Sequence, residues 1–139
     1  MDFAWTNFFI LMLISAIHVF WAFGGQWGAN ASVPKINGDR VLKPGLISTV
    51  AVAIAIAGMA AFHLYRVGVI SLYLPEWLSA SGIWLISGIF FFRAIGDFKY
   101  VGFFKSVKDS DFAKMDTRFY SPLCIVIALN ALMTGIYDI

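Results

Sequence analysis

His18 is the side chain in this sequence best suited to acid–base chemistry, and it lies inside a long apolar run. Histidine titrates near neutral pH, so a histidine in an apolar setting can act as a general acid or base. Trp21 follows one helical turn later, and Gly25 and Trp27 lie in the glycine-rich stretch after it. Two interpretations stay open: a histidine bonded to a neighbouring helix beside anchoring tryptophans, or a ligand-binding or catalytic group.

A second candidate cluster stands at the end of a later apolar run. Arg93 and Asp97 are four residues apart and can pair on one helix face. The guanidinium could then hold a carboxylate or phosphate of a ligand in a bidentate manner while Asp97 fixes its position. The alternative is that Arg93 only reaches out to lipid phosphates. Tyr120 belongs to a further polar cluster, residues 116–121, that can reach inward from the same side.

Three other residues carry weaker signals. Asn130 lies in the middle of the last apolar run, where it either bonds to a neighbouring helix or lines a cavity. His63 lies roughly 15 Å or more from His18 in depth, which excludes a shared haem, and we expect it at the membrane interface. Cys124 and His18 lack the three or four ligands that a metal site needs, so we expect no metal and no cofactor.

Four apolar runs must position these residues, because the chain is 60% hydrophobic and only 13% charged. A membrane-spanning helix needs about 17–25 mostly apolar residues. The sequence predicts an all-α integral membrane protein, with residues 1–139 as a single transmembrane domain. The predicted fold is a bundle of four transmembrane helices running up-down-up-down. The predicted spans are about residues 6–24, 46–65, 78–95 and 121–137.

The basic residues predict the orientation of the chain. Nine of the ten Lys and Arg residues lie in or beside the first and third loops, and Arg66 is the exception. The positive-inside rule places loops 1 and 3 in the cytoplasm and the N- and C-termini outside. Residues 98–118 mix phenylalanines with lysines, which predicts an interfacial segment on the inner leaflet. Whether loop 1 re-enters the membrane stays open.

The composition also limits the partners. A net charge of +2 is too small to indicate nucleic-acid binding. The lipid bilayer is the expected partner, together with an amphipathic ligand. Ala53, Ala57 and Ala61 form a stripe of small residues, which serves either packing within the molecule or a homodimer seam.

Two segments of the sequence resemble one family. They are His18-Val-Phe-Trp21-Ala-Phe-Gly24-Gly25-Gln-Trp27-Gly28 and Arg93-Ala-Ile-Gly96-Asp97-Phe-Lys-Tyr100-Val-Gly102-Phe-Phe-Lys105. The chain resembles an uncharacterised family of small bacterial membrane proteins, catalogued as a domain of unknown function with four predicted spans. The resemblance implies a multi-pass protein of the bacterial inner (cytoplasmic) membrane. It supplies no reaction, ligand or partner.

Three functions are compatible with these features. The favoured one is binding, or helping to transport, an amphipathic small molecule or lipid that enters between the first, third and fourth spans. The anionic group would meet Arg93 and the apolar part would lie against Trp21 and Phe91. An intramembrane enzyme could instead use His18 as general acid or base with Asp97 or Tyr120. The third is a structural or accessory membrane subunit. The predicted ligand-binding residues are His18, Trp21, Gly25, Trp27, Arg93, Asp97, Tyr120 and Asn130.

Overall fold

The computed structural model describes residues 2–28, 31–33, 35–37, 39–40, 45–96 and 101–137. Its helices are α1 (Asp2–Ala22), α2 (Leu46–Arg66), α3 (Glu76–Ile95), α4 (Asp111–Met115) and α5 (Ser121–Tyr137). A π-helical turn, η2 (Asp116–Tyr120), joins α4 to α5 so that residues 111–137 form one continuous helix. The chain segment that connects α1 to α2 contains two short strands, β1 (Lys35–Ile36) and β2 (Asp39–Arg40), which pair antiparallel.

The predicted fold class is confirmed. Four helices, Asp2–Ala22, Leu46–Arg66, Glu76–Ile95 and Asp111–Tyr137, are long and apolar enough to cross a membrane. Because only helices and closed barrels can satisfy their backbone groups in lipid, such helices are the expected form of a membrane-spanning chain. The chain is a multi-pass membrane protein. The direction in which it crosses the membrane stays a prediction.

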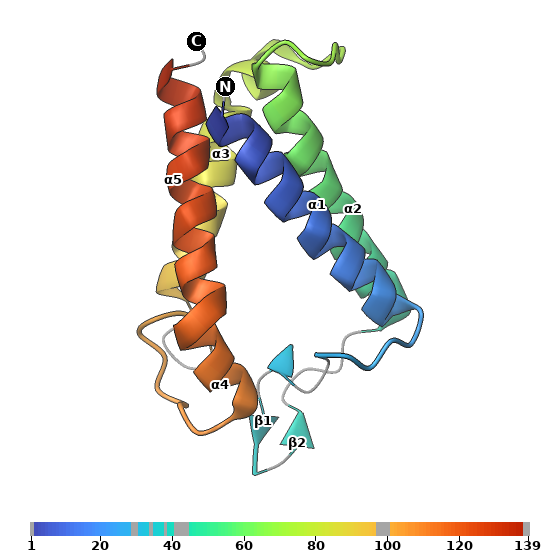
Figure 1. Ribbon diagram of the computed structural model, residues 1–139, viewed down its shortest axis with the longest axis vertical. Coiled ribbons are helices and arrows are strands. Elements are labelled where there is room, and N and C mark those ends of the chain that lie inside the picture. The colour runs from blue at the N-terminus through green and yellow to red at the C-terminus, as the bar shows by residue number, and fades with distance from the viewer. Residues whose placement is uncertain are drawn as a thin grey trace.

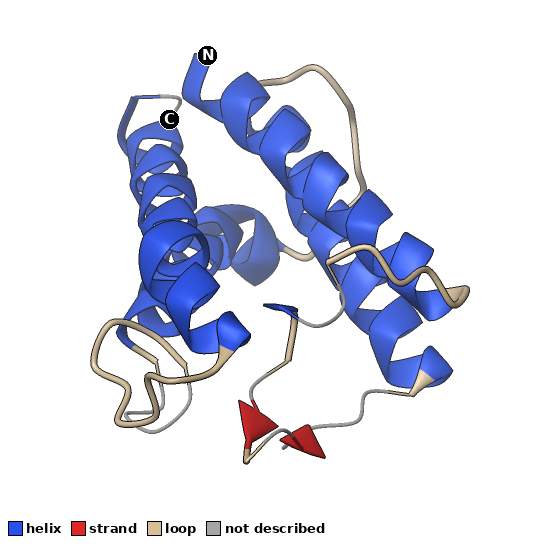
Figure 2. Ribbon diagram, turned by 60° about the horizontal axis from the view of Figure 1, so that its bottom comes forward, coloured by secondary structure: helices blue, strands red, loops and turns tan. Residues whose placement is uncertain are grey.

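The helices form two antiparallel pairs. Helix α1 packs chiefly against α2, and α3 packs chiefly against α5. The two pairs meet near the chain termini and diverge toward the α1–α2 and α3–α4 connections, as Figure 1 shows. We call the end with these connections the loop end and the opposite end the terminal end. Viewed from the loop end, the β1–β2 hairpin lies between the two helix pairs (Figure 2).

Apolar side chains hold the two pairs together. Leu11, Ala60 and Ile127, from α1, α2 and α5, form one fully buried cluster. In a second cluster, Phe62 of α2 packs against α3, where its ring lies directly over Gly82. A side chain at this glycine would overlap the ring, so the absence of a Cβ allows α2 and α3 to approach.

A buried polar network joins the same helices near the terminal end. The Asn7 amide nitrogen donates to the carbonyl oxygen of Ile127 at 2.9 Å and lies 3.0 Å from Nε2 of His63. The Asn130 amide donates to the Asn7 side-chain oxygen at 3.1 Å, while His63 Nδ1 lies 2.8 Å from the Met59 carbonyl oxygen. With Nδ1–H donating to Met59, His63 Nε2 accepts from Asn7.

The depth of His63 in the membrane stays a prediction, but nothing in the sequence indicated its partner, Asn7. His63 was expected at the membrane interface, and the structure shows that it is fully buried within the protein. Asn7 stands near the start of α1, is also fully buried, and supplies the partner that makes a buried imidazole tolerable. Of the two open interpretations for Asn130, its bond to Asn7 favours a helix-to-helix contact.

The last membrane helix begins before the predicted run that starts at residue 121. The Ser110 hydroxyl accepts from the Ala113 backbone N–H at 3.1 Å and so caps the helix at its observed start, Asp111. Pro122 would break a regular helix here, because it lacks an N–H and its ring clashes with a preceding carbonyl. The wider π-helical turn just before it lets the helix continue. Whether residues 98–118 lie on the membrane surface stays a prediction, and residues 97–100 lie outside the described residues.

Candidate functional site: a buried ionic cluster at the loop end

Asp116 is the centre of a buried cluster of charges at the loop end. Its carboxylate is fully buried, and both oxygens are bonded. Oδ1 accepts from Nη2 of Arg93 at 2.9 Å. Oδ2 accepts from the backbone N–H of Gly102 at 2.7 Å and from Nζ of Lys105 at 3.2 Å. One carboxylate therefore ties the end of α3 to the α3–α4 connection and to the turn η2.

Lys105 is the second buried charge, and its donors are all used. The residue is 3% exposed. Besides Asp116, its ammonium group donates to the carbonyl oxygen of Gly102 at 2.9 Å and to the hydroxyl of Thr117. A lysine ammonium has three N–H donors, so this count leaves none for a further partner. Lys105 is thus a structural member of the cluster.

Two glycines allow the chain to reach this arrangement. Gly96 and Gly102 have φ angles of +85° and +89°, a conformation that L side chains rarely adopt. The backbone segments around them also cross in direct contact: a Cβ on Gly96 would strike the Val101 carbonyl, and a Cβ on Gly102 would strike that of Ile95. The connection therefore turns back onto the end of α3 and brings Lys105 to Asp116.

Arg93 is the member of the cluster with spare bonding capacity. Its Nη2 is bonded to Asp116, but Nη1 is buried and has no hydrogen-bond partner among the described residues. The side chain as a whole is 32% exposed, so the group lies at the edge of the cluster. The hydroxyl of Ser121, a fully buried residue at the start of α5, also lacks a partner in the described part of the chain.

Among the described residues, the charges of the cluster do not cancel. Arg93 and Lys105 contribute two positive charges and Asp116 one negative charge, which leaves one positive charge in excess. Burying a charge away from water is costly unless it is paired. The excess is carried by the two cations together, but only Arg93 has a donor left to present. The cluster can therefore hold one further anionic group, at Nη1 of Arg93.

An apolar crevice ends one helical turn before Arg93 on α3. It has a volume of about 310 Å³ and runs between α2 and α3. Its last lining residue toward the loop end is Ile89, which precedes Arg93 by four positions and so lies on the same helix face. The crevice is lined by Ala55, Gly58, Met59, Phe62, Leu78, Gly82, Leu85, Ile86 and Ile89.

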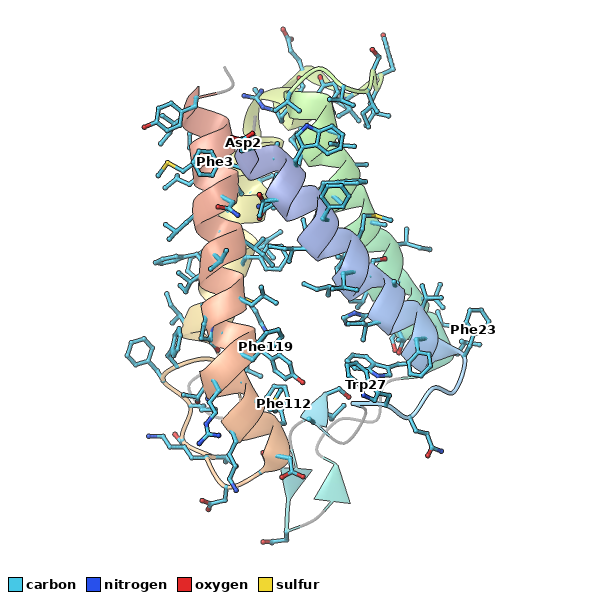
Figure 3. All side chains as sticks on the ribbon, in the orientation of Figure 1. Asp2, Phe3, Phe23, Trp27, Phe112 and Phe119 are labelled. Carbon is cyan, nitrogen blue, oxygen red and sulfur yellow. The ribbon has the colours of Figure 1, made fainter. Side chains whose placement is uncertain are left out.

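The predicted residues of the first span form a separate group on α1 and the connection after it. The rings of His18 and Trp21 meet edge to face, 5.3 Å apart, and Trp21 Nε1 donates to the Trp27 carbonyl at 2.7 Å. His18 Nδ1 lies 2.8 Å from the Ile14 carbonyl oxygen, one turn earlier. Gly25 packs directly under the ring of Phe20. Figure 3 shows Trp27 and Phe112 at the loop end, and Asp2 and Phe3 at the terminal end.

The remaining predicted residues lie apart from one another. Tyr120 donates from its hydroxyl to the Ala31 carbonyl at 2.9 Å, which connects η2 with the α1–α2 connection. Asn130 belongs to the network near the terminal end. Asp97, the predicted partner of Arg93, lies outside the described residues. The prediction that all eight residues form one ligand site stays a prediction.

Sequence reasoning missed the roles of Asp116 and Lys105. Asp116 was assigned to a polar cluster distinct from that of Arg93, although the two are directly bonded. Lys105 was counted as a charge that orients the chain and as a lysine of the predicted interfacial segment, although it is buried. A signal was present in the pair Gly96 and Gly102, because glycines close together after a helix predict a sharp return of the chain.

These features define a class of protein: a small four-helix membrane protein with a buried ionic cluster at one end of the bundle. Within this class, the chain belongs to the family described as "Protein of unknown function (DUF3995)", whose model matches residues 11–131. The predicted membership of a family of unknown function is thereby confirmed. Comparison with curated proteins gave no match, and neither did comparison with solved structures.

Proposed function

We propose that this protein binds an anionic amphiphile at the loop end, with the anionic head group on Arg93 and the apolar tail in the crevice between α2 and α3. One observation carries the proposal. Nη1 of Arg93 is a buried guanidinium nitrogen without a hydrogen-bond partner in the described residues. Proteins keep few such groups, because each costs about 1–3 kcal/mol, and more when the group is charged. An anion that accepts from Nη1 would remove this cost.

The crevice supports the second half of the proposal. Its α3 wall runs from Leu78 to Ile89, twelve residues, and the eleven helical steps between them correspond to about 16 Å at the rise of an α-helix. All nine lining residues are apolar or glycine. A hydrocarbon tail lying there would place its polar end beside Ile89, one turn from Arg93. This position differs from the predicted entry between the first, third and fourth spans.

The distribution of charge suggests where the ligand enters. Nine of the ten Lys and Arg residues lie in or beside the first and third loops of the sequence. By the positive-inside rule we place the loop end in the cytoplasm and the protein in the bacterial inner membrane. The ligand would then enter from the cytoplasmic leaflet, where the basic loops attract anionic amphiphiles.

The test uses oleate as the probe and the purified protein in non-ionic detergent micelles. A charge-assisted hydrogen bond contributes about 1.5–3 kcal/mol, so we expect Arg93→Gln to weaken oleate binding about ten- to a hundredfold. Arg118→Gln is the matched control, since this arginine is exposed in the adjacent turn. Equal affinities for the two variants would contradict the proposal.

A second pair of variants tests the crevice without touching the ionic cluster. Ile89→Trp fills its loop end and should weaken oleate binding, because the larger side chain takes the space of the tail. Ile47→Trp makes the same change at a position that is 85% exposed and should leave binding unchanged. If Ile89→Trp binds oleate as well as Ile47→Trp does, the tail lies elsewhere and the proposed site is wrong.

A further inference from the structure

The hydrogen bonds of the ionic cluster restrict the charge of the ligand that it can take. We infer that the site at Arg93 accepts a head group with a single negative charge, a carboxylate or a phosphodiester, and does not favour a doubly charged phosphate monoester. This inference rests on the proposed function and names the ligand class of the same site.

The first step is the count of donors. Both oxygens of Asp116 accept hydrogen bonds, and the ammonium group of Lys105 donates its three N–H groups to Asp116, Gly102 and Thr117. Neither residue can turn to a ligand without breaking bonds inside the cluster. At this end of the bundle, the buried side-chain donors that lack a partner among the described residues are Nη1 of Arg93 and the hydroxyl of Ser121 at the start of α5.

The second step is the balance of charge. With Arg93 and Lys105 positive and Asp116 negative, the described residues of the cluster have an excess of one positive charge. A singly charged head group brings the sum to zero. A phosphate monoester carries a charge of about −1.5 to −2 at pH 7, so it would bring a second negative charge beside Asp116. In a poorly hydrated site an uncompensated charge is strongly unfavourable, and like charges repel.

The third step is the number of acceptors that the site can satisfy. The two N–H groups on Nη1, the buried and unpartnered nitrogen of Arg93, suit a head group with two anionic oxygens. A carboxylate has two such oxygens, and a phosphodiester also has two unesterified oxygens. A monoester has three oxygens of this kind, and the third would find no donor on Asp116, which only accepts, or on Lys105, whose three N–H groups are already bonded.

The experiment compares four probes that share the oleyl chain: oleyl alcohol, oleate, oleyl methyl phosphate and oleyl phosphate. The unmodified protein in non-ionic detergent is titrated with each by calorimetry at pH 7.5. We expect both single anions to bind about tenfold or more tightly than the alcohol, in line with one charge-assisted hydrogen bond. Oleyl phosphate should bind no more tightly than oleyl methyl phosphate. Tighter binding of oleate would indicate a free fatty acid as the source of the ligand, and tighter binding of oleyl methyl phosphate would indicate a phospholipid head group.

Two results would overturn the inference, and they differ in what else they overturn. If oleyl phosphate binds about tenfold more tightly than oleyl methyl phosphate, the site favours a double charge, and the proposed function survives. If neither single anion binds more tightly than the alcohol, the proposed function fails together with the inference. Because the titration uses the unmodified chain, no result depends on whether a variant folds.

Discussion

Replacing Asp116 by asparagine tests whether the ionic cluster holds the loop end together. The change keeps the shape of the side chain but removes the only negative charge that the cluster has among the described residues. Lys105 is 3% exposed, and in the variant its ammonium would keep the Gly102 carbonyl and the Thr117 hydroxyl as neutral acceptors but would lose the negative charge of Asp116. Arg93 is one-third exposed and can turn partly outward.

Removing one partner of a buried ion pair costs about 3–5 kcal/mol. Since Arg93 can reorient and Lys105 cannot, we expect a loss near the lower limit, about 3 kcal/mol of unfolding free energy. Coulomb's law gives a similar scale, about 4 kcal/mol for unit charges 4 Å apart at an effective dielectric constant of 20. The measurement is equilibrium unfolding in mixed micelles, followed by tryptophan fluorescence and circular dichroism.

The control is Asp109→Asn, which removes the same charge from an exposed position in the same connection. We expect a change within about 0.5 kcal/mol for this variant. Combining Asp116→Asn with Lys105→Met should cost less than the sum of the single changes, because the stranded charge is gone. A loss below about 1 kcal/mol for Asp116→Asn would refute the account of a charge-compensated cluster.

Three further predictions concern the rest of the fold. Gly102→Ala should strongly destabilise the loop end, because φ at this position is positive and a Cβ would overlap the Ile95 carbonyl. Gly88→Ala should be tolerated, because a Cβ at Gly88 would meet open space. Thermal unfolding in detergent compares the two variants. Asn7→Leu should lower unfolding free energy by about 1–3 kcal/mol by stranding buried partners, and an unchanged value would contradict the network. Tyr120→Phe removes one hydrogen bond and should speed hydrogen exchange in the α1–α2 connection with little loss of stability.

The helices could be predicted from the sequence because each depends on a local property. An apolar run of about twenty residues has few alternatives in a bilayer, and basic loops mark one end of the bundle. The start of the last helix could not be predicted in the same way. It depends on the cap at Ser110 and on a π-helical turn that accommodates Pro122.

The site was less predictable because its contacts join residues far apart in the chain. Arg93 and Asp116 are 23 positions apart, and Asn7 and His63 are 56 positions apart. A helix-spacing rule finds partners three or four residues away, so it directed attention to Asp97 and away from Asp116. The residue types were informative, since a buried arginine or histidine needs a partner, but the identity of that partner depends on how the helix pairs meet.

The central claim is that Nη1 of Arg93 holds the anionic group of an amphiphile. This contact is measured directly by nuclear magnetic resonance, as magnetisation transfer between carboxyl-¹³C-labelled oleate and ¹⁵N-arginine-labelled protein in lipid bilayers. We expect a cross-peak from the carboxyl carbon to one guanidinium, lost in Arg93→Gln and kept in Arg118→Gln. A cross-peak that survives in Arg93→Gln would contradict the account, and so would oleate bound to the protein without contact to any arginine.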